Sequence, residues 1–292
     1  MRRGFTLIEL VIVVVIVAFL SVAAFKAVSL LVVKSYKSKE ITRLSLESQI
    51  AIDQLSAWLR YRVPATVIGY DPARSTQQYK PLYELDEEYP VLEWIGYEPL
   101  WSDEGNYSGF VDMLASDKSS GLLRTQVQRD AQALIFAGSF DRAYVNTQDY
   151  TDAFGWHGGR SLEVFEVQRS GDDLLIVGTN KPKWIYEKYY LLQGAYALAR
   201  GAQVQKEATC LQGEDIDDDT LLLFYDYRPW KGESFCADPN AQNGAGKVTV
   251  LLRNVAGIHI FEQDYTIRII FDIHKQIKDS VAVHFSKMKV VF

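Results

Sequence analysis

The stretch MRRGFTLIELVIVVVIVAFL (residues 1–20) opens a run that stays apolar from Phe5 to Val33. The polar or charged residues within this run are Thr6, Glu9, Ser21, Lys26 and Ser29. An α-helix of this length spans about 43 Å, more than the roughly 30 Å hydrocarbon core of a bilayer. The sequence therefore predicts a transmembrane helix over about residues 5–33.

Arg2 and Arg3 precede the apolar run, so the positive-inside rule predicts a cytoplasmic N-terminus and an exported remainder. The alternative is a secretory signal peptide, whose apolar core of about 7–15 residues is followed by a small-residue cleavage site. Here the run is longer, and the small residue, Gly4, stands before it. Cleavage at Gly4 would remove the charged tip and keep the membrane helix.

The residues Arg2-Arg3-Gly4-Phe5-Thr6-Leu7-Ile8-Glu9 resemble the class III signal of type IV pilins and type II secretion pseudopilins. In that family a prepilin peptidase cuts after the glycine and methylates the new N-terminal phenylalanine. The resemblance implies that residues 1–4 are a leader, that cleavage falls between Gly4 and Phe5, and that Phe5 becomes N-methylated. It also implies a single-pass protein of the bacterial inner membrane with a periplasmic head. Its implied partners are membrane lipid, the inner-membrane assembly platform, and other minor and major pilins or pseudopilins.

Glu9 is costly in a lipid-facing segment, because an unpaired carboxylate there costs at least about 2.5–3.5 kcal/mol. The resemblance implies an assembly role, in which Glu9 of one subunit meets the free α-amino group of Phe5 on a neighbour. Each group would then neutralise the charge of the other. The alternative is a side chain that snorkels to the cytoplasmic interface, as we also expect of Lys26.

Beyond the membrane segment, apolar residues continue at a helical spacing: Ile41, Leu44, Ala51, Ile52, Leu55, Trp58 and Leu59. The pattern ends at Val63-Pro64, since proline disfavours helix in the residue before it. We therefore predict one helix over residues 5–61, whose second half, 34–61, packs on a head formed by residues 62–292. The segment IDQLSAWLR (residues 52–60) resembles the larger minor pseudopilins of the GspJ and PilW type.

The first part of the head, residues 62–160, is rich in Tyr, Trp, Pro, Gly and acidic residues and shows little periodicity, which predicts long loops. Within it, Ala133–Ala137 is a predicted strand and Leu122–Ala133 a predicted short helix. Residues 161–168 and 173–179 predict a strand pair, and residues 183–201 predict one or two further strands.

The end of the chain predicts an antiparallel sheet over residues 247–292. Its expected strands are residues 247–252, 257–261, 265–273, 280–285 and 287–292. In IRIIFDI (residues 267–273) apolar residues alternate with Arg268 and Asp272, the period-two pattern of a half-buried strand. The predicted fold class is α+β and pilin-like: a long N-terminal helix packed on an antiparallel β-sheet head with elaborated loops.

The net charge of −6 argues against nucleic-acid binding driven by overall charge. The chain has two cysteines, Cys210 and Cys236. A head outside the cytoplasm favours a disulfide between them, whereas in a reducing compartment they would be unrelated thiols.

Motifs for catalysis or metal binding are missing from the sequence, which has no H-x-x-x-H, C-x-x-C or G-x-S-x-G spacing. Residues 244–247 (GAGK) are interpreted as a turn before a strand rather than as a phosphate loop. In the acidic run of residues 214–219, Asp215, Asp217 and Asp219 are weak Ca²⁺ candidates, and residues 103–106 are weaker still. The run lacks the EF-hand spacing, so a solvated loop is favoured, and neither a cofactor nor enzymatic activity is expected.

These features favour a minor pilin or pseudopilin at or near the tip of a type IV pilus or a type II secretion pseudopilus, where it would prime or cap the fibre. A head of about 230 residues (62–292) is bulky for a repeating shaft subunit. The alternative function is a pilus-tip binding module, an adhesin or uptake pilin whose head contacts a surface or ligand. Four tryptophans would either form such a surface or, in the favoured interpretation, fill the core: Trp94, Trp101, Trp156 and Trp230.

Overall fold

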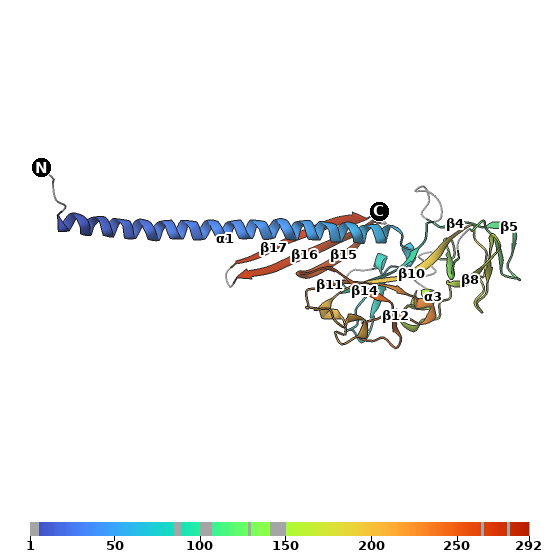
Figure 1. The fold of residues 1–292 in the computed structure, drawn as a ribbon. Coiled ribbons are helices and arrows are strands. Elements are labelled where there is room, and N and C mark those ends of the chain that lie inside the picture. The colour runs from blue at the N-terminus through green and yellow to red at the C-terminus, as the bar shows by residue number, and fades with distance from the viewer. Residues whose placement is uncertain are drawn as a thin grey trace.

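The computed structural model describes residues 6–84, 89–99, 107–127, 130–140, 150–263, 266–278 and 281–291. A long helix, α1 (Leu7–Arg60), projects from a β-rich head (Figure 1). The start of α1 lies at one end of the molecule, and β5 (Asp112–Asp117) and β8 (Phe165–Ser170) lie at the other. This arrangement confirms the predicted α+β, pilin-like class.

The head is built mainly from antiparallel strands. The remaining strands in chain order are β1 (Ile68–Tyr70), β2 (Tyr79–Pro81), β3 (Val91–Tyr97), β4 (Gly109–Phe110), β6 (Leu122–Arg124), β7 (Ala133–Phe136), β9 (Asp173–Ile176), β10 (Lys188–Arg200), β11 (Leu221–Tyr227), β12 (Ser234–Phe235), β13 (Gly244–Ala245), β14 (Lys247–Leu252), β15 (Val255–Gln263), β16 (Thr266–Lys278) and β17 (Val281–Val291). The short helical segments are α3 (Tyr150–Phe154), η1 (Pro64–Thr66), η2 (Leu82–Glu84), η3 (Trp156–Gly158), η4 (Gly201–Gln203), η5 (Thr209–Leu211) and η6 (Pro229–Lys231).

The two halves of α1 have different surroundings. Residues 7–32 are exposed, whereas the second half buries one face against the head: Glu40, Leu44, Ser48, Ala51, Ile52, Leu55 and Leu59. These residues recur every three or four positions, so they share one side of the helix. The helix ends at Arg60, shortly before Pro64, as the sequence predicts.

Polar contacts also join α1 to the C-terminal strands. The prediction that Ile41 faces the head is wrong, because this side chain is 40% exposed. Glu40 takes the buried position instead, since its carboxylate pairs with Lys275 at 2.9 Å. A second pair joins Asp53 to Lys289 at 3.1 Å.

One large sheet runs through the head in the order β2-β1-β3-β10-β7-β8-β9-β6-β5, with β4 and β11 paired to β10 and β14 paired to β11. The 13-residue β10 lies at its centre, where it pairs with β7 near its start and with both β3 and β11 further on. Most side chains on both faces of β10 are buried. This two-sided burial suits its nearly continuous aromatic and aliphatic sequence.

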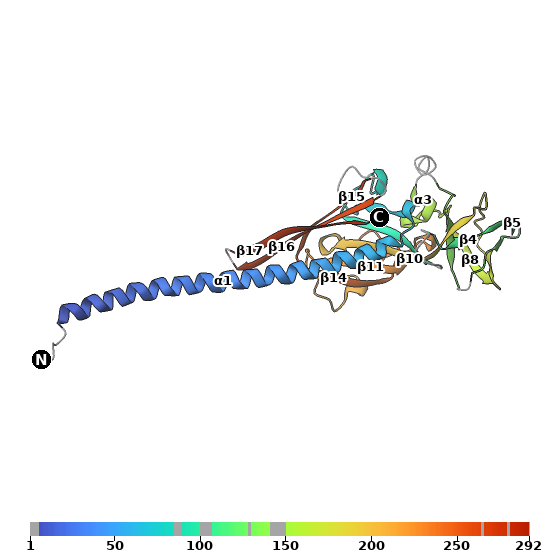
Figure 2. The same cartoon turned by 90° about the horizontal axis from the view of Figure 1, so that it is seen from above.

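The strands β15, β16 and β17 form a separate antiparallel meander that lies along α1 (Figure 1 and Figure 2). Alternate residues of β16 (Ile267, Ile269, Phe271 and Ile273) are at most 1% exposed and belong to the same buried cluster as Leu55 of the helix. The period-two prediction for this segment is therefore confirmed.

Three predictions for the head are corrected. Residues 247–252 form β14, which pairs with β11 in the large sheet and not with the C-terminal meander. Residues 280–285 and 287–292 are not separate strands, because Ser286 keeps register in β17 and its hydroxyl donates to Asp272. Leu122–Ala133 is not a helix, since its first residues form β6 against β9, and tertiary pairing overrides local propensity.

Other strand predictions are confirmed. The pair formed by residues 161–168 and 173–179 corresponds to β8 and β9, and residues 133–137 contain β7. Residues 183–201 supply one strand, β10. The region 62–160 is more ordered than predicted, because β1 to β7 all lie in it. Many of these strands have only two to four residues, too few for a period to show in the sequence.

Candidate functional sites at the N-terminus and in the head

Thr6 and Glu9 form a reciprocal capping box at the start of α1. The Glu9 carboxylate accepts hydrogen bonds from the Thr6 backbone N–H at 3.0 Å and from the Thr6 hydroxyl at 2.8 Å. The Glu9 backbone N–H in turn donates to that hydroxyl at 3.4 Å. The spacing T-x-x-E is the sequence signature of this box, but the sequence interpretation considered a partner for Glu9 on another subunit and missed it. Gly4 and Phe5 lie outside the described residues.

The first half of α1 is left uncovered by the described parts of this chain. Among the described residues, α1 is the helix that is long and apolar enough to cross a membrane, and its most apolar segment is wholly unburied. Leu7 and Phe25, for example, are 83% and 78% exposed. Apolar surface of this extent suits a bilayer or other apolar helices as its surroundings.

In the head, His157 lies between two buried carboxylates. Its Nε2 is 2.8 Å from Glu93 Oε1, and its Nδ1 is 3.4 Å from Asp238 Oδ2. The side chain of His157 is 9% exposed, and both carboxylate side chains are 0% exposed. The Tyr227 hydroxyl donates to Glu93 at 2.7 Å, and the Tyr70 hydroxyl donates to Asp238 at 2.9 Å. We call His157, Glu93 and Asp238 the His157 cluster, and these three residues come from three segments that are far apart in the sequence.

The backbone and the charge of His157 are both unusual. With φ +48° and ψ +41° it adopts a left-handed conformation, which costs a non-glycine residue roughly 1–3 kcal/mol. Burial alone lowers the pKa of the imidazole, but the charge of Glu93, the hydrogen bond to Glu93 and the nearby carboxylate of Asp238 outweigh it and raise the pKa to about 10. The imidazole is therefore protonated at neutral pH, and the carboxylates of Glu93 and Asp238 balance its charge.

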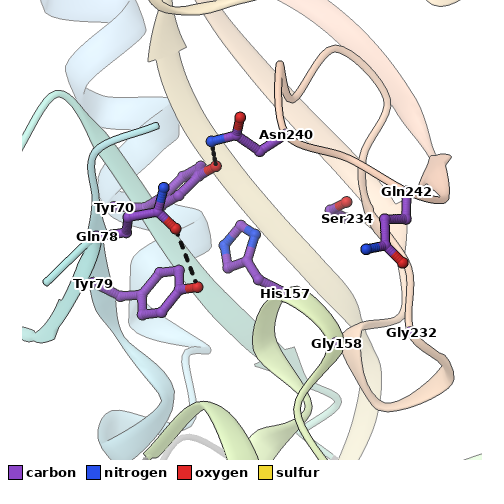
Figure 3. A pocket seen from close by; sticks show the side chains of 9 residues that line it. All are labelled: Tyr70, Gln78, Tyr79, His157, Gly158, Gly232, Ser234, Asn240 and Gln242. Carbon is purple, nitrogen blue, oxygen red and sulfur yellow. Dashed lines mark hydrogen bonds between the residues drawn. The ribbon is translucent and has the colours of Figure 1, made fainter. Parts of the chain in front are cut away.

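A cavity of about 360 Å³ opens beside His157 (Figure 3). Its described lining consists of aromatic, amide, hydroxyl and glycine residues: Tyr70, Gln78, Tyr79, His157, Gly158, Gly232, Ser234, Asn240 and Gln242. The imidazole packs against two tyrosine rings, tilted against Tyr70 with centroids 4.1 Å apart and stacked on Tyr79 with centroids 5.1 Å apart, and these two tyrosine rings also contact each other. Among the described lining residues none is Asp, Glu, Lys or Arg. The cavity is therefore polar but almost uncharged at its surface.

Comparison with known proteins identifies the N-terminal segment. A family model described as the prokaryotic N-terminal methylation motif matches residues 1–25. The chain is a pilin-like protein with an N-methylation motif. Such a motif is typical of type IV pilins and pseudopilins, and together with the apolar helix it fits a single-pass inner-membrane protein. No curated protein and no solved structure matches the pilin-like chain.

A disulfide joins Cys210 and Cys236 of the pilin-like head, as the sequence predicts. It connects η5 to the residue that follows β12. The segment around β12 also forms one wall of the cavity. Disulfides persist in oxidising compartments, so this bond agrees with a head outside the cytoplasm.

Replacing both cysteines with serine is expected to lower the free energy of unfolding by about 3–4 kcal/mol. The bond closes a loop between two residues 26 positions apart, and this loop restricts the conformations of the unfolded chain. Urea denaturation of the full chain in detergent measures the change. A reducing agent should produce the same loss in the wild-type chain and none in the serine variant. Equal stability of the oxidised wild type and the variant would contradict this expectation.

The acidic run near the disulfide does not gather into a cation site. Among the described residues, no group of three or more His, Cys, Asp or Glu side chains is arranged to hold a metal ion, and this includes Asp215, Asp217 and Asp219. Asp218, between two of these candidates, pairs with Lys206. Residues 103–106, the weaker candidate, lie outside the described residues.

The tryptophans mostly fill the core, as favoured from the sequence. Trp94, Trp156 and Trp230 are 0%, 1% and 8% exposed, so these three are unavailable as a binding surface. Trp101 lies outside the described residues. The interpretation of residues 244–247 as a turn before a strand is confirmed, because Gly246 at φ +90° joins β13 to β14.

Proposed function

We propose that this pilin-like chain is a minor pilin or pseudopilin, cleaved between Gly4 and Phe5, methylated at Phe5 and assembled into a type IV pilus or a type II secretion pseudopilus. The main support is the methylation motif, which is followed by a 54-residue helix. The first half of this helix is exposed, and its second half packs against the head. Such a helix exchanges lipid for neighbouring helices without disturbing the head. The proposed role is structural rather than enzymatic, and the GspJ and PilW type is the subtype that the sequence favours.

The proposed orientation places the N-terminus in the cytoplasm and the head in the periplasm before assembly. Arg2 and Arg3 support it through the positive-inside rule, and the Cys210–Cys236 disulfide supports it because such bonds persist outside the cytoplasm. Processing by a prepilin peptidase and extraction by an inner-membrane assembly platform follow from this proposal.

Glu9 has two available partners in the proposed cycle. In the isolated chain its carboxylate is hydrogen-bonded by Thr6, which satisfies two of its acceptor sites but leaves its charge unpaired. In a fibre, the α-amino group of Phe5 on a neighbouring subunit would supply the opposite charge. Because a buried charge is far less costly when paired, this contact favours one register between adjacent helices.

The size of the head favours a position at or near the tip. About 230 residues (62–292) follow the helix, and the head extends well past the end of α1 (Figure 2). Subunits of this bulk would crowd one another in a repeating shaft, whereas a tip position leaves one side of the head free. A priming or capping role follows from that position.

Deletion of the gene tests the assembly role. The expected result is a loss of surface fibres or of pseudopilus-dependent secretion, restored by the wild-type gene. Antibody against the head should label fibre ends and leave the shaft unlabelled. Normal fibre numbers after deletion would contradict the assembly role.

The second candidate function is a tip binding module, an adhesin or uptake pilin, and the cavity beside His157 is the observation that favours it. The same deletion separates the two functions. Normal fibres with lost attachment to a surface would support the binding module and overturn the assembly role.

A further inference from the structure

We propose that the cavity beside His157 binds a neutral, hydroxyl-rich ligand, namely a sugar residue of a glycan. This site goes beyond the assembly role, which concerns α1. A cavity of about 360 Å³ lies within the range of about 300–1,000 Å³ that is usual for small-molecule sites. Three segments build it: β1 and β2, the η3 turn and the chain around β12 (Figure 3).

Two hydrogen-bonding side chains in the cavity have no protein partner within the described part of the chain. Ser234 is only 7% exposed, and its hydroxyl lies at the cavity (Figure 3). Gln242 offers its amide from the same segment. Both groups border the cavity, and both can donate and accept hydrogen bonds. Ligand hydroxyl groups, which also donate and accept, complement this pair.

The aromatic wall supplies the second element of sugar recognition. His157 and Tyr79 are stacked, with an interplanar angle of 13°, and Tyr79 is only partly buried. The face of an aromatic ring is electron-rich, so it attracts the slightly positive C–H groups on the flat side of a sugar ring. Asn240 braces this wall, since its amide nitrogen donates to the Tyr70 hydroxyl at 3.1 Å and to the Pro72 carbonyl at 2.9 Å.

The charge distribution selects against ions. The protonated His157 is the one charged residue in the described lining, and a cationic ligand would meet it first. The same imidazolium offers little attraction to an anionic ligand, because the carboxylates of Glu93 and Asp238 already balance its charge at 2.8 Å and 3.4 Å. Since the lining offers no Lys or Arg to an anion and no Asp or Glu to a cation, a neutral ligand avoids both costs.

Saturation-transfer NMR on the full chain tests the proposal. The chain is held in a detergent whose headgroup contains no sugar, and the probes are the methyl glycosides of glucose, galactose, mannose and N-acetylglucosamine. At least one probe is expected to receive saturation at millimolar concentration. Ser234→Ala and Gln242→Ala should each weaken that binding about two- to tenfold, the usual effect of one lost hydrogen bond. Both substitutions remove groups without a partner in the described chain, so the melting temperature should stay unchanged.

Gln212→Ala, at an exposed glutamine outside the cavity, is the matched control and should bind as the wild type does. Tyr79→Phe keeps the ring and should retain binding, whereas Tyr79→Ala should abolish it. The proposal is overturned if none of the glycosides binds, or if Ser234→Ala and Gln242→Ala leave binding unchanged. It is also overturned if inorganic phosphate or choline, the charged probes, competes for the cavity better than the sugars do.

Discussion

His157→Ala is expected to lower the free energy of unfolding of the head by about 3–5 kcal/mol, the usual cost of removing one partner from a buried ion pair. The substitution leaves Glu93 and Asp238 without their cation, and both side chains are 0% exposed. It also removes a ring that packs against Tyr70 and Tyr79. Urea denaturation of the full chain in detergent, followed by tryptophan fluorescence, measures the loss.

His284→Ala is the matched control, because His284 is exposed on the C-terminal meander, and it should change the free energy of unfolding little. His157→Gln separates packing from charge, since it keeps a polar side chain of similar size without the positive charge. This variant should still lose most of the stability. Variants of His157 as stable as the His284 control would show that the buried cluster does not hold the head together.

The cluster also predicts a dependence of stability on pH. Folding raises the pKa of His157 from about 6.5 to about 10, so the folded state binds the proton more tightly. The stabilisation is fully present below about pH 6.5 and is lost as the pH rises through about 10. The difference in stability between wild type and His157→Ala should therefore shrink over this interval. A difference that is independent of pH would contradict the assigned charge.

Glu9→Leu is expected to leave the chain processed and inserted in the membrane but to abolish its incorporation into fibres. Leucine removes a carboxylate that costs at least about 2.5–3.5 kcal/mol in a membrane helix, so insertion is not impaired. The amine of Phe5 on the neighbouring subunit, however, loses its proposed partner. Immunoblotting of the membrane and sheared-fibre fractions measures both outcomes.

Two further variants separate the intermolecular contact from the capping box of the isolated chain. Glu9→Gln keeps an oxygen that accepts from the Thr6 backbone N–H but has no charge, and it should fail to incorporate. Thr6→Ala removes the hydroxyl that bonds Glu9 but keeps the charge, and it should incorporate. If Glu9→Gln assembles normally and Thr6→Ala does not, the glutamate acts through the helix cap.

The N-terminal and C-terminal parts of the fold could be predicted because their signals are local. The apolar run over residues 5–33 indicates a segment surrounded by apolar groups, and the alternation in residues 267–273 indicates a strand with one buried face. The helix cap was equally local, and the T-x-x-E spacing of Thr6 and Glu9 would have revealed it. The middle of the head carries no such local pattern, because its short strands are defined by pairing with neighbouring strands of the large sheet rather than by their own period.

The buried cluster could not be predicted from the sequence for a related reason. His157 lies in a glycine-rich turn, and Glu93 lies in β3. Asp238 lies in a loop close to Cys236 of the disulfide. Each residue alone is typical of an exposed polar position. Their chemistry arises only when the sheet brings the three segments together, so it is a property of long-range packing.

Mass spectrometry of the mature chain tests the central claim most directly. The account predicts that the purified protein begins at Phe5, that this residue carries one N-methyl group, and that residues 1–4 are missing. An intact N-terminus at Met1, or a chain that begins after Val33, would contradict the proposal that this protein is processed as a pilin.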